Sequence, residues 1–202
     1  MTAKFGKDRF PYAYQNAVGQ YAGNQILHAN SIELANILID NKILTPESKI
    51  FEMGAGGCRN LYYIYKTLED HNTENLELYA NDLFKDSSFT NMHEDIQKII
   101  NFYEGDSEDI ANQNITPDLD LFLVSDHFMH LQYEKADNII KKVLSDWKPK
   151  HIMLRELKKE HETPDHPRLY HDYNQILNDY EMVSETTSEQ DHAYFIWLLK
   201  RK

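Results

Sequence analysis

The residues most suggestive of ligand chemistry lie between Phe51 and Asn60, in the stretch FEMGAGGCRN. Glu52 falls near the end of a short apolar run, and glycines occupy positions 54, 56 and 57. Glycine lets the chain turn sharply and lets a ligand touch the main chain. A helix that opens directly after such a turn adds N–H groups without intrahelical partners. The stretch therefore predicts a small-molecule binding loop between a strand and a helix.

Two common nucleotide-binding loops do not fit this stretch. The dinucleotide fingerprint Gly-x-Gly-x-x-Gly, counted from Gly54, requires a third glycine where the chain has Arg59. Its ribose-binding acid is expected about 20 residues further on, whereas Asp82 lies 26 residues past Gly56. A phosphate-binding P-loop ends in Gly-Lys-Ser/Thr, which is absent here. Taken alone, the stretch also fits an ordinary glycine-rich turn.

The elements that must position this loop alternate along the chain. Asn30 and Glu33 have the spacing of a capping box, which predicts that a helix begins there and stops before Thr45-Pro46. Apolar runs and helical periodicity predict the remaining elements. The predicted strands cover residues 49–53, 77–81, 100–104, 119–125, 151–155, 181–186 and 192–199. The predicted helices cover residues 59–68, 133–145 and 170–178.

The pattern of these elements predicts the fold class. The central strands are apolar without alternation, as in a parallel sheet that helices cover on both faces. The last two strands are close enough to form a hairpin, which places an antiparallel strand at the sheet edge. We expect an α/β, Rossmann-like three-layer sandwich with a mostly parallel seven-stranded sheet and an antiparallel C-terminal strand.

Composition narrows the classes of partner. The 202 residues carry a formal net charge of −12, which opposes binding to nucleic acid or to an anionic membrane surface. A single cysteine, Cys58, leaves no intrachain disulfide. The chain has neither the apolar core of a signal peptide near its start nor an apolar run of about 18 residues. These features predict a cytoplasmic protein.

Five segments resemble, in order, the motifs of class I S-adenosylmethionine (SAM)-dependent methyltransferases. Glu-x-Gly-x-Gly at 52–56, followed by GCRNLYYIY, resembles the first motif, and LYANDLF and FYEGDSEDI resemble the acid-bearing ends of the second and third strands. DLDLFLVSDHFMHL and VLSDWKPKHIMLREL resemble the fourth and fifth strand segments. The resemblance covers residues 30–202, the predicted SAM-binding domain, and leaves 1–29 as an aromatic-rich lid segment.

The resemblance implies a set of cofactor contacts. Glu52 offsets the positive end of SAM, Asp82 accepts hydrogen bonds from the ribose hydroxyls, and Asp106 accepts one from the adenine amino group. Asn81, directly before Asp82, leaves the ribose position open by one residue. The expected cofactor-binding residues are Glu52, Gly54, Ala55, Gly56, Asp82, Leu83, Asp106, Ser107 and Ser125.

Catalytic and substrate residues are expected beyond the carboxyl ends of the strands. His127 is a candidate general base, and packing on the cofactor is its alternative role. Arg155 fits either a clamp for a substrate carboxylate or an ion pair within the protein. The expected substrate-contacting residues are Tyr14, Tyr21, His130, Arg155, Tyr170 and His171.

Two other features are weaker indications of a functional site. His161, His166 and His171 recur every five residues, which is not the spacing of one helical face, so a loop is favoured over a metal site. Cys58 at a helix start is a conceivable nucleophile, but a loop filled by SAM leaves it no room.

The resemblance predicts a methyltransferase that uses SAM on a small-molecule acceptor, by O- or N-methylation, without nucleic acid or a membrane. Two alternatives stay open: a non-catalytic SAM-binding sensor or partner subunit, and a SAM-consuming enzyme of another reaction type. The sequence indicates neither the acceptor nor the oligomeric state.

Overall fold

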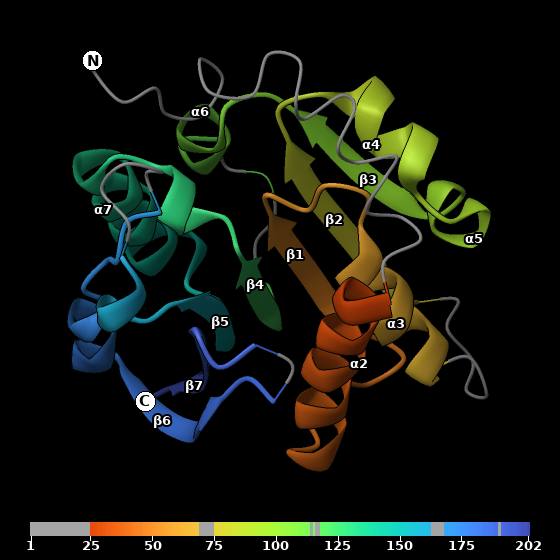
Figure 1. Cartoon of the computed structure of the whole chain (residues 1–202). Coiled ribbons are helices and arrows are strands. Elements are labelled where there is room, and N and C mark those ends of the chain that lie inside the picture. The colour runs from red at the N-terminus through yellow and green to blue at the C-terminus, as the bar shows by residue number, and fades with distance from the viewer. Residues whose placement is uncertain (1–24, 69–74, 114, 116–117, 163–167, 190) are drawn as a thin grey trace.

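Seven strands form one sheet in the computed structural model, which describes residues 25–68, 75–113, 115, 118–162, 168–189 and 191–202 (Figure 1). Their order across the sheet is β3-β2-β1-β4-β5-β7-β6. The strands are β1 Lys49–Met53, β2 Glu77–Asp82, β3 Ile100–Glu104, β4 Leu121–Ser125, β5 His151–Leu157, β6 Tyr180–Thr187 and β7 Tyr194–Arg201. The predicted α/β sheet is therefore confirmed, with six of the described strands parallel to one another and β7 opposed to both its neighbours.

The strand order creates the place where a ligand can bind. From β1 the chain proceeds to β2 and β3 on one side, then returns to place β4 against the other side of β1. At such a reversal the loops after the two central strands diverge and open a crevice at their carboxyl ends. The glycine stretch follows β1 and therefore lies at this crevice.

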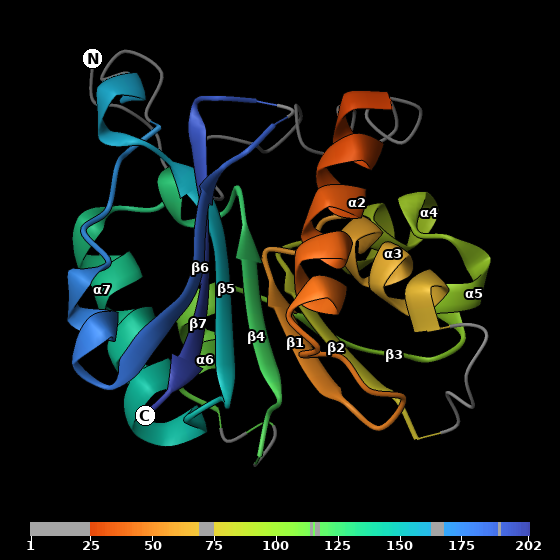
Figure 2. The same ribbon diagram turned by 90° about the horizontal axis from the view of Figure 1, so that it is seen from below.

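Helices cover both faces of the sheet, as Figure 2 shows, with α2 and α3 on one side and α6 and α7 on the other. The described α-helices are α2 Gln25–Asp40, α3 Arg59–Leu68, α4 Lys85–Asn91, α5 Glu94–Gln97, α6 Ser107–Ala111 and α7 Tyr133–Lys142. Alternate residues along the strands enter two separate cores, Ile50 towards α2 and α3 and Phe51 towards α7. Burial on both faces explains why these strands are apolar without alternation.

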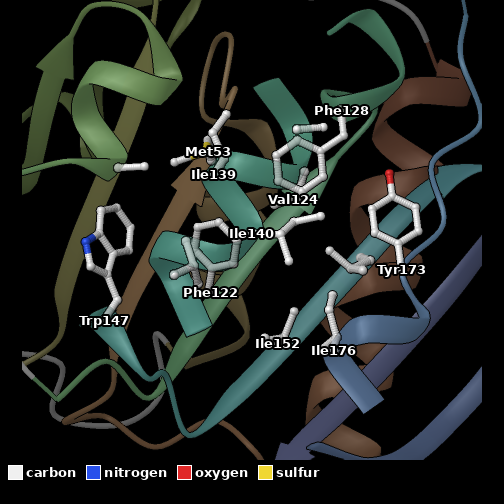
Figure 3. Close-up of a cluster of buried hydrophobic side chains, with 14 of the residues drawn as sticks. Met53, Phe122, Val124, Phe128, Ile139, Ile140, Trp147, Ile152, Tyr173 and Ile176 are labelled. Carbon is white, nitrogen blue, oxygen red and sulfur yellow. The ribbon is translucent and has the colours of Figure 1, made fainter. Parts of the chain in front are cut away.

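The core on the α7 side is rich in aromatic residues. Trp147 packs edge-on against Phe51 with ring centroids 4.8 Å apart, and Phe128 stacks on Tyr173. Figure 3 shows these layers between the sheet and α7. The residues labelled there are Met53, Phe122, Val124, Phe128, Ile139, Ile140, Trp147, Ile152, Tyr173 and Ile176. This packing fixes the loop that follows β4, because Phe128 lies in that loop and is buried in this core.

The predicted start of the first helix is wrong. Helix α2 already includes Gln25, so Asn30 lies inside it and the boundary drawn at residue 29 falls within a helix. Glu33 does not complete a capping box. Its carboxylate accepts hydrogen bonds of 2.7 Å from Ser188 Oγ and from the Glu189 main-chain N–H, in the turn between β6 and β7. Residues 1–24, most of the predicted lid, lie outside the described residues.

Two further expectations need correction. The antiparallel strand β7 does not form the sheet edge, because it inserts between β5 and β6. The helix predicted at 170–178 is only a short 3-10 helix, η5, at Asn174–Asn178. Short α4, α5 and α6 were not predicted because four to seven residues show too little periodicity to recognise. No described helix is long and apolar enough to span a membrane.

Candidate functional site

The loop after β1 has a backbone that few side chains tolerate. Gly54 and Gly56 have φ values of 70° and 52°, and buried Cys58 has φ 53°. The Ala55 N–H donates to Asn81 O of β2 at 2.9 Å, which ties the loop to the neighbouring strand. Glycine adopts the left-handed region without the steric cost that other residues meet. The loop therefore offers main chain, rather than side chains, to the crevice.

The missing side chain of Gly54 also makes room for His127, which lies in the loop after β4. A Cβ added at Gly54 would lie 2.6 Å from His127 Cβ and closer still to the ring atoms Cγ and Nδ1. The imidazole therefore lies directly against the glycine backbone. Its Nε2 is 2.7 Å from Ser107 Oγ, so His127 links the loops after β1, β3 and β4.

Loss of hydration lowers the pKa of His127 to about 4, and the positive charge of Lys135 acts in the same direction. The ring is therefore neutral at pH 7. A neutral imidazole is available to accept a proton, but a conjugate acid with so low a pKa would hold that proton weakly. The described contacts of His127 are with Gly54 and Ser107, and both of its predicted roles, general base and packing on the cofactor, remain predictions.

Glu52 brings a buried carboxyl group to the base of the glycine loop. Its side chain is 2% exposed, and Oε1 accepts a hydrogen bond of 2.6 Å from Asn60 Nδ2 in the first turn of α3. Oε2 is buried and accepts no hydrogen bond of ordinary geometry from the described residues. Burial raises the pKa of Glu52 to about 8, and the nearby charge of Asp82 adds to this. An orphaned acid here suits a positively charged group.

Asp82 closes β2 with its carboxylate turned to the glycine loop. Oδ2 accepts the Gly56 N–H at 2.8 Å and Oδ1 accepts the Leu83 N–H at 2.7 Å. Asn81 is buried and serves another purpose, because its Nδ2 donates to Tyr103 O and Gly105 O at 3.0 Å each. The structure thus places the side chain of Asp82, and not that of Asn81, on the glycine loop.

Asp106 follows β3 and caps helix α6. Its Oδ1 accepts the Glu108 N–H at 2.9 Å, while Oδ2 pairs with Lys135 of α7. Partial burial raises the pKa of Asp106. Lys135 and the Glu108 N–H together lower the pKa by more than burial raises it, so it lies below the usual value. Ser107 Oγ donates to Asn81 Oδ1 at 3.0 Å. A ligand that uses the Asp106 carboxylate must share it with Lys135.

Glu156 fixes the start of the loop after β4. Its carboxylate accepts three main-chain N–H groups, from His127 at 3.0 Å, Phe128 at 2.9 Å and Met129 at 3.1 Å. Burial raises the pKa of Glu156 to about 8, and the charge of Asp126 adds to this. The carboxyl group holds η2, Phe128–His130, in place and with it the position of His127.

Arg155 is 1% exposed, and its guanidinium pairs with Asp126. The same guanidinium carbon lies 4.2 Å from the centre of the Tyr194 ring. Of the two roles predicted for Arg155, the internal ion pair is the one that the described contacts contain.

The other predicted substrate residues do not form one group. Tyr14 and Tyr21 lie outside the described residues. His130 ends η2 and is half-buried, close in sequence to His127. Tyr170 lines a separate cavity of about 590 Å³ with Trp197 and Phe195 of β7. His171 is buried, with its ring 5.2 Å from that of Tyr133 at the start of α7.

The remaining sequence candidates are placed as follows. Ser125 is the last residue of β4 and is half-buried, at the edge where the crevice opens. Burial raises the pKa of the Cys58 thiol well above its usual value, so the thiol stays protonated rather than acting as a nucleophile. His166 lies outside the described residues. Among the described residues, no cluster of three histidine, cysteine or acidic side chains could hold a metal ion.

Three residues of the site escaped the sequence analysis. Asn60 has a weak signal, because it lies in the first turn of the helix that follows Glu52. Lys135 and Glu156 have no signal in the sequence, because each contacts partners that lie 27 to 29 residues away in the chain.

The fold matches solved SAM-dependent methyltransferases. Magnesium protoporphyrin IX methyltransferase from Synechocystis PCC 6803, with bound SAM, aligns over 100% of both chains with a TM-score of 0.67 and 14% identity. A SAM-dependent methyltransferase from Aquifex aeolicus aligns over 93% of this chain and 98% of that one, with a TM-score of 0.66 and 14% identity. The small RNA methyltransferase HEN1 aligns over 100% of this chain and 26% of its own, with a TM-score of 0.55 and 16% identity. The sequence matches no family model and no curated protein.

Proposed function

We propose that this protein is a SAM-dependent methyltransferase that acts on a small-molecule acceptor. The observation that carries the proposal is the convergence of four loops at the carboxyl ends of β1 to β4. Asp82 bonds the glycine loop, and His127 packs on Gly54 and contacts Ser107. The fold likeness to SAM-dependent methyltransferases supports the same reading.

The residues present fit the parts of SAM. The left-handed backbone at Gly56 offers main chain to the methionine portion, beside the His127 ring that lies on Gly54. The buried Oε2 of Glu52 suits the ammonium group of SAM. We assign Asp82 to the ribose hydroxyls and Asp106 to the adenine amino group of SAM. When bound, SAM supplies an activated methyl group. The protein's part is to align the acceptor with it and to exclude water.

A small molecule is the favoured acceptor. The net charge of −12 opposes the approach of a polyanion such as RNA. On this ground we favour a small molecule over RNA as the acceptor. Whether the accepting atom is oxygen or nitrogen depends on the side chains that follow β4.

The proposed function is tested by binding and turnover together. Isothermal titration of the full chain with SAM and with S-adenosylhomocysteine should give dissociation constants in the micromolar range. Incubation with SAM and a pool of small metabolites should then form S-adenosylhomocysteine. Absence of binding at millimolar cofactor would refute the proposal, and binding without turnover would favour a SAM sensor or partner subunit instead.

Binding of SAM should release a proton from Glu52. The pKa of about 8 keeps this carboxyl protonated at pH 7, and an adjacent ammonium group favours its ionised form. We expect release of about half a proton to one proton per SAM at pH 7, decreasing above pH 8. Titration calorimetry in buffers of different ionisation enthalpy measures this number.

The matched variant for this prediction is Glu52→Gln, which keeps the shape but has no proton to release. Its heat of SAM binding should not depend on the buffer. In the free wild-type protein the raised pKa stabilises the fold most below pH 4.5, and this contribution is lost as pH rises through about 8. A wild-type binding heat that is the same in every buffer would contradict the prediction.

A further inference from the structure

Asp126, the residue that follows β4, has a partly exposed side chain that pairs with a buried arginine. Its φ of 57° lies in the left-handed region, which costs a non-glycine residue about 1 kcal/mol or more. Two contacts with β5 hold it there. The Asp126 N–H donates to Arg155 O at 2.9 Å, and Oδ1 pairs with the Arg155 guanidinium. Asp126 is not among the individual site residues expected from the sequence.

The two members of this ion pair differ in exposure. The Asp126 side chain is 32% exposed, whereas that of Arg155 is 1% exposed. Oδ1 faces the guanidinium, and no described residue donates a hydrogen bond to Oδ2. With part of its side chain exposed and Oδ2 without a donor among the described residues, the carboxylate can accept a hydrogen bond from a ligand while Arg155 balances its charge. An exposed surface pair would leave both groups in water.

Asp126 is also next to the residue that contacts the cofactor loop. His127 packs on Gly54, and adjacent Cα atoms lie about 3.8 Å apart. If SAM occupies the glycine loop, the position beyond its sulfonium is bordered by Asp126. The charged and titratable groups that act on Asp126 come from the segments around it. They are Arg155 and Glu156 on β5, Arg168 between β5 and η5, Asp191 between β6 and β7, and Tyr194 at the start of β7.

We infer that Asp126 contacts the methyl acceptor and receives its proton, so that the accepting atom is an N–H or O–H group and not a carboxylate. The inference rests on the proposed function. In the reaction, the acceptor nitrogen or oxygen bonds to the methyl carbon while the carbon–sulfur bond breaks and its electron pair stays on sulfur. The acceptor's proton passes to Asp126 Oδ2 and then to water. A carboxylate acceptor is repelled by Asp126 and finds Arg155 already engaged.

The side chain of Asp126 is only partly exposed, and the loss of hydration on its covered part raises its pKa against the opposing effect of Arg155, which supports this assignment. A carboxylate with a raised pKa is a better proton acceptor than an ordinary surface aspartate. Tyr194 covers the face of the guanidinium, so the support behind Asp126 is fixed by packing as well as by charge.

The experiment uses fragments, since the acceptor itself is not needed. ¹⁵N-labelled protein saturated with S-adenosylhomocysteine is titrated with benzylamine, phenol and benzoate, each up to about 10 mM. We expect benzylamine or phenol to shift the amide signals of Asp126 and His127, and benzoate not to. Asp126→Asn should weaken that binding about 10-fold or more, as expected for a lost hydrogen bond to a charged group. Asp40→Asn, an exposed carboxylate at the far end of α2, serves as the charge-matched control.

Each outcome of the fragment titration either supports or overturns the role assigned to Asp126. Shifts that survive Asp126→Asn, equal shifts with benzoate, or no shifts at Asp126 with any of the three fragments would overturn the assignment while leaving the proposed function standing. Failure of S-adenosylhomocysteine to bind would instead refute the proposed function, and the assignment with it.

Discussion

Replacing Gly54 by alanine is expected to lower both the stability of the protein and its affinity for SAM. The new Cβ would lie 2.6 Å from His127 Cβ, and a φ of 70° is costly for any residue with a side chain. Rotation of the imidazole cannot relieve the clash fully, because the first carbon of the histidine side chain is itself too close. Left-handed strain of about 1–2 kcal/mol and overpacking of about 1–3 kcal/mol add together.

We expect a loss of about 2–4 kcal/mol in the free energy of unfolding, which corresponds to a melting temperature lower by roughly 5–15 °C for a chain of this length. SAM affinity should fall at least about 10-fold because the Cβ displaces His127 and distorts the loop that is proposed to bind the cofactor. Thermal unfolding and titration calorimetry measure the two effects.

A double-mutant cycle identifies the cause. His127→Gly removes the ring and its Cβ, so Gly54→Ala added to it should cost only the backbone strain, about 1–2 kcal/mol. Equal costs of Gly54→Ala in the presence and absence of His127 would show that the imidazole does not lie against this glycine.

Asp82→Asn is expected to weaken SAM binding about 30- to 300-fold. The carboxylate accepts the N–H groups of Gly56 and Leu83, and an amide can accept only one of them while its NH₂ faces the other. The unsatisfied N–H costs about 1–3 kcal/mol, and a ribose hydroxyl loses a charged acceptor. The two effects combine because the same carboxylate shapes the loop and is proposed to bind the sugar.

Adenosine separates these contributions, since it contains the ribose and adenine but no methionine. We expect Asp82→Asn to weaken the binding of adenosine by a smaller factor than that of SAM, as measured by calorimetry, because adenosine reports on the sugar contact without the methionine portion that lies on the loop. Glu104→Gln is the matched control, because Glu104 pairs in register with Asp82 at the end of the next strand and is exposed. If Glu104→Gln weakened SAM binding as much as Asp82→Asn, the effect would arise from net charge and not from the ribose contact.

Much of the scaffold could be predicted from local patterns. The strand at Lys49–Met53 and the helix at Arg59–Leu68 have the predicted bounds, because apolar runs and helical periodicity are properties of neighbouring residues. The ends of longer elements were less accurate. The apparent capping box at Asn30 failed, since Glu33 forms its hydrogen bonds with a turn more than 150 residues away.

The composition of the site was only partly visible in the sequence. The glycine loop and the acids at 82 and 106 stand where strand ends converge, and the order of strands makes that convergence necessary. The sequence did not indicate that Asp106 is shared with Lys135, or that Arg155 is paired with Asp126. Each pair joins residues 29 positions apart, from separate strand and helix units.

The sequence by itself determined where the chain forms strands, where glycine frees the backbone, and which acids lie at the crevice. Only the tertiary structure decided the order in which β7 enters the sheet, the contact between His127 and Gly54, and the state of each buried carboxyl group. The reason is physical. Backbone preference and amphipathic pattern arise within a few residues, whereas loss of water and the choice of charge partner depend on what the complete fold places nearby.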